Sequence, residues 1–503
     1  MSNMETTVQR SIFTGAVRAD SEYRQLLASV GVQRRANPKP VLVTGLCEGA
    51  CDALSAALCE DMPGGRPAVI ICPEEKECLR LASIATSLGL RAAFYPVRDL
   101  NFYNITASRE FEHNRLGVLF GISGGLFDVI LTTPDAALGY TMPPSSLANN
   151  LISVSLDDGE CGGISALVDS LTAAGYIRAD APGSETLGSS GLVEGAGQFA
   201  VRGGIVDVAA PSMRIVRADG SRDGGAFALR IEFFGDEIDR MGLFDTATQR
   251  VTEQIKSAVL APARELLAGR DELAAISAAV RSLRKKTKDP RVGDELDGEL
   301  AALDTAIAAG GEVRFLDKYI SLIYSEKSCL LDYFSPMSLC LIRGNAAVSD
   351  RLKAAEWHAA KEAEEMVASG VIAGKYAEYS APASRLTGFI SKHTTVLLDS
   401  LMQGMSGAEL GGLYGFRTKH SLSCAGNDAL LREELEGYVK GGYRVVLMAG
   451  SESASANYAG LLREWGFNAR DAGDGNALDP DTVDRGEVAV ISSAPISPFE
   501  MTV

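Results

Sequence analysis

Residues 197–211, which read Gly197-Gln-Phe-Ala-Val-Arg-Gly-Gly-Ile-Val-Asp-Val-Ala-Ala-Pro211, are the most distinctive segment of the chain. Short strands with alternating side chains begin here and recur downstream, at residues 198–202, 205–208, 227–234 and 237–241. Gly-rich turns separate these strands, and strands connected in this way pair antiparallel. Together with a helix expected at 164–174, they predict an α+β domain over about 148–255.

Arg202 ends the first of these strands. Phe199 and Val201 share one face of that strand, and Ala200 and Arg202 share the other. The following Gly203-Gly204 permits a tight turn or bulge at which Arg202 would be displayed. From the residues alone, Arg202 is either a group that contacts a partner or a solvated arginine that pairs with a nearby acid such as Asp207.

The regions on either side have a different pattern, in which buried strands alternate with helices. Strands are expected at 40–44, 68–72, 91–95 and 127–133, and again at 394–398, 444–448 and 488–491. Strands that alternate with helices indicate a parallel sheet with right-handed crossovers. The sequence therefore predicts a multidomain α/β protein with four segments: a first domain at 1–147, the inserted α+β domain at 148–255, the second part of the first domain at 256–387, and a final α/β domain at 388–503.

Composition narrows the classes of function. The 503 residues carry 48 Lys and Arg against 65 Asp and Glu, a formal net charge of −17, which argues against a chain built mainly to bind polyanions. The basic run at 281–288 is interpreted as the solvated end of a helix. Nine cysteines without a CxxC pair and only four histidines give no support to a metal site. No run of 18 apolar residues occurs, and we expect a cytoplasmic protein.

The turn after the first strand lies where a phosphate-binding loop would be. It reads Thr44-Gly-Leu-Cys-Glu-Gly-Ala-Cys-Asp52. A working loop needs a Lys for the phosphates and a Ser or Thr hydroxyl for magnesium, and Ala50, Cys51 and Asp52 stand there instead. We interpret the loop residues Gly45, Gly49, Ala50 and Cys51 as an inactive remnant, and Asp52 as a charge that would repel phosphate.

A nucleotide hydrolase also needs an acidic, metal-holding residue after a buried strand. The best candidate strand is Ser338-Leu-Cys-Leu-Ile-Arg-Gly344, where Arg343 stands at the position of the expected acid. Because both halves of the machinery are missing, we expect no ATP hydrolysis and no catalytic residue in this chain.

At this point a family resemblance emerges. The segment 197–211, together with Leu229-Arg-Ile-Glu-Phe-Phe-Gly-Asp-Glu-Ile-Asp-Arg240 and Leu243-Phe-Asp-Thr-Ala-Thr-Gln249, resembles the UvrB-homology module of the bacterial transcription-repair coupling factors, the Mfd family, and more distantly UvrB. The family patterns G-x-F-x-V-R-G-x-x-x-D, R-x-E-F-F-x-D-E-I and F-D-x-x-T-Q occur here in order. The resemblance covers most of the chain.

The resemblance implies a split, degenerate RecA-like domain, an inserted UvrA-binding domain like the second domain of UvrB, and a family-specific small α/β domain. It implies contact with UvrA through Arg202 and Arg178, with Phe199 supporting the strand. Ala200 stands where UvrB-like sequences often carry a second arginine. RNA polymerase, DNA, ATP and Mg²⁺ would be bound by parts of the full-length ATP-dependent translocase outside this chain, which itself needs no cofactor.

The function expected from this resemblance is non-catalytic recruitment of UvrA to lesion-stalled RNA polymerase in nucleotide excision repair. The alternatives are a nucleotide-dependent DNA-remodelling enzyme, active within residues 1–147 and 258–385, and a structural scaffold without a retained partner. The missing loop Lys and the arginine at 343 argue against the enzyme. Binding to UvrA would exclude the scaffold.

Overall fold

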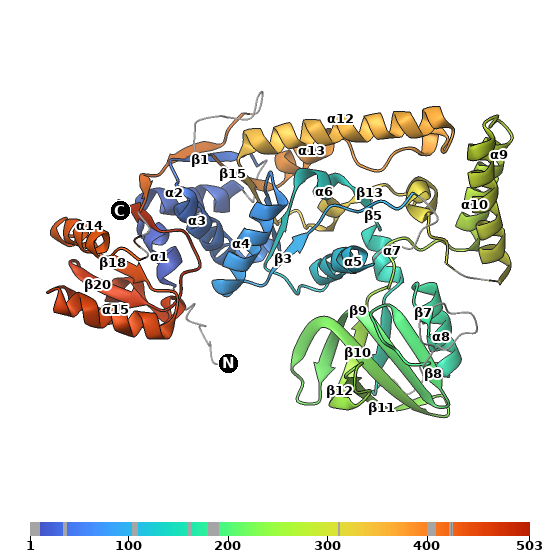
Figure 1. Ribbon diagram of the computed structural model, residues 1–503, viewed down its shortest axis with the longest axis horizontal. Coiled ribbons are helices and arrows are strands. Elements are labelled where there is room, and N and C mark those ends of the chain that lie inside the picture. The colour runs from blue at the N-terminus through green and yellow to red at the C-terminus, as the bar shows by residue number, and fades with distance from the viewer. Residues whose placement is uncertain are drawn as a thin grey trace.

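The computed structural model describes residues 11–33, 38–102, 109–157, 162–179, 191–309, 312–399, 409–421, 424 and 426–502. These residues form a body around one large parallel sheet, a domain that projects below it, and a small α/β unit at the opposite end (Figure 1). The multidomain α/β class predicted from the sequence is confirmed.

The large sheet has seven strands among the described residues, and neighbouring strands in it run parallel. Its spatial order is β16 (Gly412–Gly415), β1 (Val41–Thr44), β15 (Thr394–Leu398), β14 (Leu339–Arg343), β2 (Ala68–Ile71), β4 (Val129–Thr132) and β3 (Ala92–Tyr95). The central strands are buried on both faces. This explains their continuous apolar sequences, since a parallel sheet is covered on both sides.

Alternate side chains of these strands enter two separate cores. On β1, Leu42 packs into one core, whereas Val41 and Val43 pack into the other. The helices α3 (Glu48–Asp61) and α4 (Glu75–Ser87) cover one face, and α5 (Glu110–Ser123) and α6 (Pro134–Leu138) cover the other. Because the strands run parallel, their carboxyl ends lie at one edge of the sheet, where ligands of open α/β sheets usually bind.

The projecting domain is a strongly bent, seven-stranded sheet with α8 (Gly163–Ala173) packed on its core. Its spatial order is β6 (Ile152–Ser155), β12 (Val251–Leu260), β11 (Glu237–Phe244), β10 (Arg222–Phe234), β9 (Ile205–Arg217), β8 (Gln198–Arg202) and β7 (Ile177–Arg178). The additional pairing of β12 with β9 closes part of the sheet on itself. The antiparallel strands expected here are confirmed, although the sheet continues to Leu260, past the expected boundary at 255.

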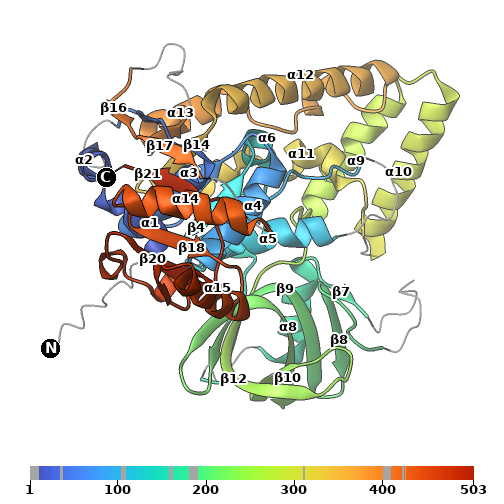
Figure 2. The ribbon, with the colours of Figure 1, turned by 60° about the vertical axis from the view of Figure 1, so that its left-hand side comes forward.

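One strand lies in a different sheet from the one that the sequence suggested. We expected residues 394–398 to open the final domain, but β15 is the third strand of the large sheet, between β1 and β14. A boundary at 388 would therefore separate hydrogen-bonded neighbours. The final unit is a smaller three-stranded sheet, ordered β18 (Val445–Met448), β20 (Glu487–Ile491) and β19 (Asn468–Asp471). Figure 2 shows it beside α1 (Ile12–Ala19).

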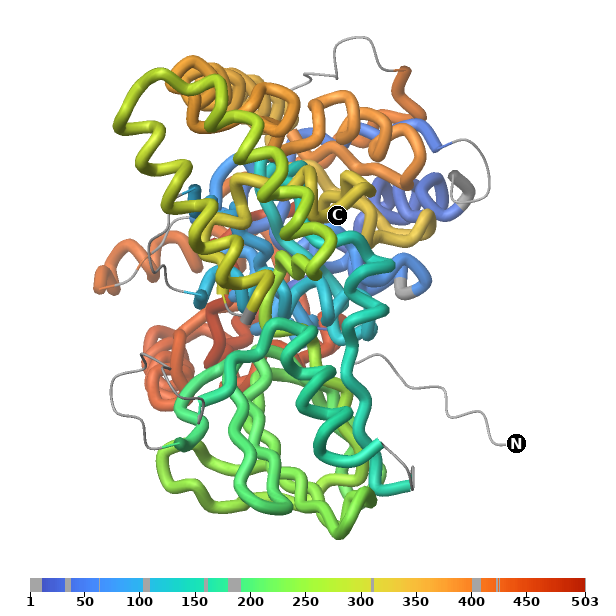
Figure 3. Tube along the Cα trace, turned by 90° about the vertical axis from the view of Figure 1, so that its right-hand side faces the viewer, coloured from blue at the N-terminus to red at the C-terminus, as the bar shows by residue number. Residues whose placement is uncertain are grey.

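A helical hairpin stands on the opposite side of the body from that unit. It consists of α9 (Arg270–Arg284) and α10 (Pro290–Ala309), and Figure 3 shows it above the projecting domain. The basic run begins within α9, where Arg281 pairs with Asp304 at 2.7 Å and Arg284 pairs with Asp297 at 2.9 Å. Among the described helices, none combines the length and apolar character required to cross a lipid bilayer.

Candidate functional sites: a closed strand–helix loop and the end of the projecting sheet

The loop between β1 and α3 is covered by distant parts of the same chain. The backbone N–H of Cys47 donates to the Thr418 hydroxyl at 2.7 Å, and that hydroxyl donates to the Gly45 carbonyl at 2.9 Å. A Cβ atom on Gly49 would lie 1.9 Å from the Ser497 carbonyl oxygen. The start of a helix attracts anions because its first N–H groups are free. Here protein oxygens already lie against that start.

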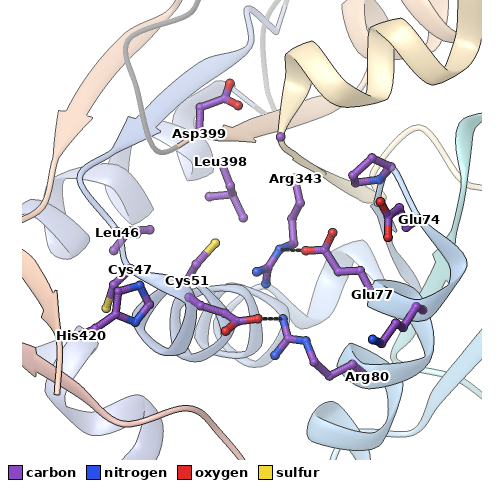
Figure 4. A pocket seen from close by; sticks show the side chains of 14 residues that line it. Leu46, Cys47, Cys51, Glu74, Glu77, Arg80, Arg343, Leu398, Asp399 and His420 are labelled. Carbon is purple, nitrogen blue, oxygen red and sulfur yellow. Dashed lines mark ion pairs between the residues drawn. The ribbon is translucent and has the colours of Figure 1, made fainter. Parts of the chain in front are cut away.

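Asp52 lies on α3, which follows this loop, and two arginines neutralise its buried charge. Its carboxylate is 2.6 Å from Arg80 and 2.6 Å from Arg343, and its side chain is fully buried. Arg343 also pairs with Glu77 at 3.0 Å, and Figure 4 shows these two side chains directed toward each other. The expected repulsion of phosphate by Asp52 is therefore reduced, because arginines already balance its charge.

The same groups explain the protonation of Arg343 and Cys51. Burial alone would lower the pKa of Arg343, but nearby Cys51, Asp52 and Glu77 outweigh burial and raise it above its usual value. Burial also raises the pKa of the Cys51 thiol, so the thiolate that would act as a nucleophile is disfavoured. Ala50 is completely buried.

A cavity of about 660 Å³ opens at this edge of the sheet (Figure 4). Its lining contains three basic residues, Lys76, Arg80 and Arg343, and four acidic residues, Glu48, Glu74, Glu77 and Asp399. A polyphosphate needs a surplus of positive charge around it, and this lining has none. Among the described residues, no three His, Cys, Asp or Glu side chains are grouped closely enough to hold a metal ion.

Arg202 lies at the end of β8, and 41% of its side chain is exposed. It pairs with Asp207, whose own side chain is 1% exposed. The pairing with Asp207 that the sequence suggested as an alternative is thus present. The side chain of Arg202 nevertheless remains partly exposed, so pairing with Asp207 and contact with a partner can coexist.

Arg230 is a second arginine on this face, and sequence reasoning missed it. It donates to both oxygens of Asp207, at 2.7 and 2.9 Å. In the sheet register Asp207 lies directly between Ala200 on β8 and Arg230 on β10. Arg230 therefore lies beside Asp207 on the side away from Ala200. The triad of Arg202, Asp207 and Arg230 carries one net positive charge.

The other two residues predicted for partner contact lie elsewhere. Phe199 is 1% exposed in the core of the projecting domain, so it supports β8 and cannot itself touch a partner. Arg178 is exposed, but it is paired in register with Phe199 on the edge strand β7. Paired residues point to the same side of a sheet. Arg178 therefore lies on the face opposite to that of Arg202.

Comparison with known proteins identifies the projecting domain. The model of the UvrB interaction domain matches residues 154–266, which cover the sheet from within β6 to just beyond β12. The UvrABC system protein B of Chlorobium phaeobacteroides is 30% identical over 162 residues, which are 29% of this chain and 21% of that protein. The chain is therefore a multidomain α/β protein with a UvrB interaction domain.

The likeness extends well beyond this domain. The transcription-repair-coupling factor of Bacillus subtilis is 23% identical over 475 residues, which are 92% of this chain and 37% of that protein. The corresponding protein of Haemophilus influenzae is 23% identical over 274 residues, 54% of this chain and 21% of its own length. This chain is similar to transcription-repair-coupling factors over 92% of its length, and the resemblance predicted from the sequence is confirmed. The matched part of the chain spans 37% of the length of the Bacillus subtilis protein and 21% of that of the Haemophilus influenzae protein.

Proposed function

We propose that this chain is the part of a transcription-repair coupling factor that recruits UvrA to RNA polymerase stalled at a DNA lesion. The observation that carries the proposal is the UvrB interaction domain at 154–266, which contains the accessible Arg202 at the end of its sheet. RNA polymerase and DNA would be bound by regions of a longer protein outside this chain. The recruitment would belong to transcription-coupled nucleotide excision repair.

Within this proposal the chain is not itself an enzyme. Three observations support this. Thr418 and Ser497 cover the loop at Gly45–Gly49, Arg343 replaces the acid that would hold Mg²⁺, and the nearby cavity has more acidic than basic residues. A nucleotide would have to displace the covering segments and would still lack a lysine for its phosphates. The rival function, a nucleotide-driven DNA-remodelling enzyme, would require that lysine.

Binding to UvrA tests the proposal directly. The whole chain should form a saturable complex with purified UvrA from the same organism in a calorimetric titration at physiological salt. An interaction domain that has kept its partner should bind without nucleotide added to this chain. A flat titration, with both proteins shown to be folded by circular dichroism, would contradict the proposed function.

We also expect no binding of ATP. A calorimetric titration of the chain with Mg-ATP should give only the heat of dilution, because the α3 N-terminus already contacts the Ser497 carbonyl and Asp52 is already paired. A phosphate-release assay should likewise show no turnover. A dissociation constant in the micromolar range would show that the covering segments move aside, and would restore the rival function.

A further inference from the structure

The cavity at the edge of the large sheet lies where the strand order reverses. The strand that follows β14 in the sequence is β15 on one side of it, whereas the chain leaves the adjacent β2 toward β3 on the other side. The connecting helices, α12 (Asn345–Ser369) after β14 and α4 after β2, also pack on opposite faces. Open α/β sheets bind small molecules in the crevice that such a reversal creates. The volume of about 660 Å³ is within the usual range for these sites.

The arginines that line the cavity already have partners within the chain. Arg80 contacts Glu48 at 3.1 Å, and Arg343 contacts Glu77 at 3.0 Å. Both arginines also contact the buried Asp52. Three acidic groups therefore surround two basic ones, and this part of the lining has no positive charge left for an anionic ligand.

Two other carboxylates of the lining, Glu74 and Asp399, form no ion pair within the described chain. The Oδ1 atom of Asp399 accepts a hydrogen bond from the backbone N–H of Asn345 at 2.9 Å. Its Oδ2 atom is buried without a hydrogen-bond partner, and burial raises the pKa of this carboxyl group. A buried oxygen without a partner costs free energy. A cationic donor would remove that cost and favour the charged form of Asp399.

The separation of these two carboxylates favours a long ligand over a metal ion. The strand β14 lies between β15 and β2, so the strands that lead to Asp399 and Glu74 are two strand spacings apart, roughly 10 Å. Figure 4 shows the two side chains well apart. A Mg²⁺ or Ca²⁺ ion needs several oxygens within about 2.6 Å, and no group of three suitable side chains occurs among the described residues. Leu46, Pro73 and Leu398 add apolar surface to the lining, which suits an aliphatic chain.

The charge of the whole site indicates how many positive charges the ligand carries. Lys76, the third basic residue of the lining, is exposed on α4. With Asp52 included, five acidic residues face three basic ones, so the site carries two surplus negative charges. A ligand with two cationic groups would balance them.

We propose that this cavity binds a short aliphatic diamine, with one ammonium group on Asp399 and the other on Glu74. The alkyl chain would lie against the apolar part of the lining. Putrescine, a four-carbon diamine, spans roughly 10–12 Å when it is extended and makes one charge-assisted hydrogen bond of about 2.8 Å at each end. This span agrees with the separation of the two strands that carry the carboxylates.

The test is a calorimetric titration of the whole chain with putrescine at neutral pH and low salt. The wild type should show saturable binding, and butylamine, which has a single ammonium group, should bind about tenfold more weakly or worse. Asp399→Asn and Glu74→Gln should each weaken putrescine binding by about tenfold or more, the loss of one charge-assisted contact. Asp399→Asn keeps an Oδ1 atom that can accept from Asn345, so its melting temperature should stay close to that of the wild type. Asp304→Asn, in an exposed ion pair of the helical hairpin, is the matched control and should bind like the wild type.

Three results would overturn the inference. The first is a flat titration of the folded wild type with millimolar putrescine. The second is an unchanged affinity in Asp399→Asn, which would show that the diamine binds elsewhere on this acidic chain. The third is equal affinity for butylamine and putrescine, which would show that two cationic ends are not required. UvrA takes no part in these titrations, so their result is independent of the function proposed above.

Discussion

Replacing Glu265 by alanine should lower the free energy of unfolding by about 3–5 kcal/mol, the usual cost of removing one partner from a buried ion pair. The Glu265 side chain is fully buried between two arginines. Arg115 donates to both of its oxygens at 3.0 Å, and Arg98 lies 2.8 Å away. These arginine side chains are only 1% and 10% exposed, so Glu265→Ala would leave positive charge buried without its main counter-charge.

This cluster lies where the projecting domain meets the body. Glu265 follows the last strand of the projecting domain, whereas Arg115 belongs to α5 in the body. The pair therefore joins the UvrB interaction domain to the parallel sheet. Urea unfolding followed by circular dichroism measures the effect. Asp304→Ala removes an ion pair whose side chains are both 53% exposed, and should leave the unfolding midpoint nearly unchanged. Equal midpoints for the two variants would show that the buried cluster adds no stability.

The same cluster predicts a dependence on acid. Burial alone would raise the pKa of Glu265, but Arg115 and Arg98 outweigh burial and lower it from 4.5 to about 2. A group whose pKa is lower in the folded state stabilises the protein above its unfolded pKa. Its contribution should therefore be complete above about pH 4.5 and should be lost as the pH falls toward 2. Glu265→Gln has no carboxylate, so its unfolding free energy should lack this part of the decline.

The sequence was sufficient for the parts of the fold that depend on local patterns. Continuous apolar strands predicted the parallel sheet, and alternating strands around Gly203-Gly204 predicted the antiparallel domain. The position of β15 could not be predicted in the same way. Its five residues are apolar enough for either sheet, and its pairing with β1, more than 350 positions earlier, is set by packing and not by local sequence.

In the candidate sites, too, some features follow from the local sequence and others only from the fold. The missing lysine near Ala50 and the arginine at 343 are visible in the sequence, because each motif specifies a residue type at a fixed position. The ion pair between Asp52 and Arg343 joins residues 291 positions apart, and no spacing rule connects them. Likewise, Arg230 and Asp207 lie 23 positions apart, and only the register of β10 with β9 brings them together.

Arg202→Ala should weaken UvrA binding by about 2 kcal/mol or more, roughly 30-fold, if its contact is one of the dominant ones in the interface. The guanidinium offers a planar fork that a carboxylate can accept with two hydrogen bonds. Folding should change little, because Arg230 would still hold both oxygens of the buried Asp207. Arg202→Glu should bind even more weakly, since it places a negative charge beside Asp207 and opposite the partner's carboxylate.

Arg230→Ala and Arg178→Ala are the matched comparisons for this experiment. Arg230→Ala removes the arginine with two hydrogen bonds to Asp207, so it should lower the melting temperature more than Arg202→Ala does. Arg178→Ala should affect binding less, because Arg178 lies on the opposite face of the sheet. Titration with UvrA and thermal melting should be measured on all three variants. If Arg202→Ala unfolds the domain while its remaining folded fraction binds UvrA with full affinity, Arg202 is a structural residue and the partner surface lies elsewhere.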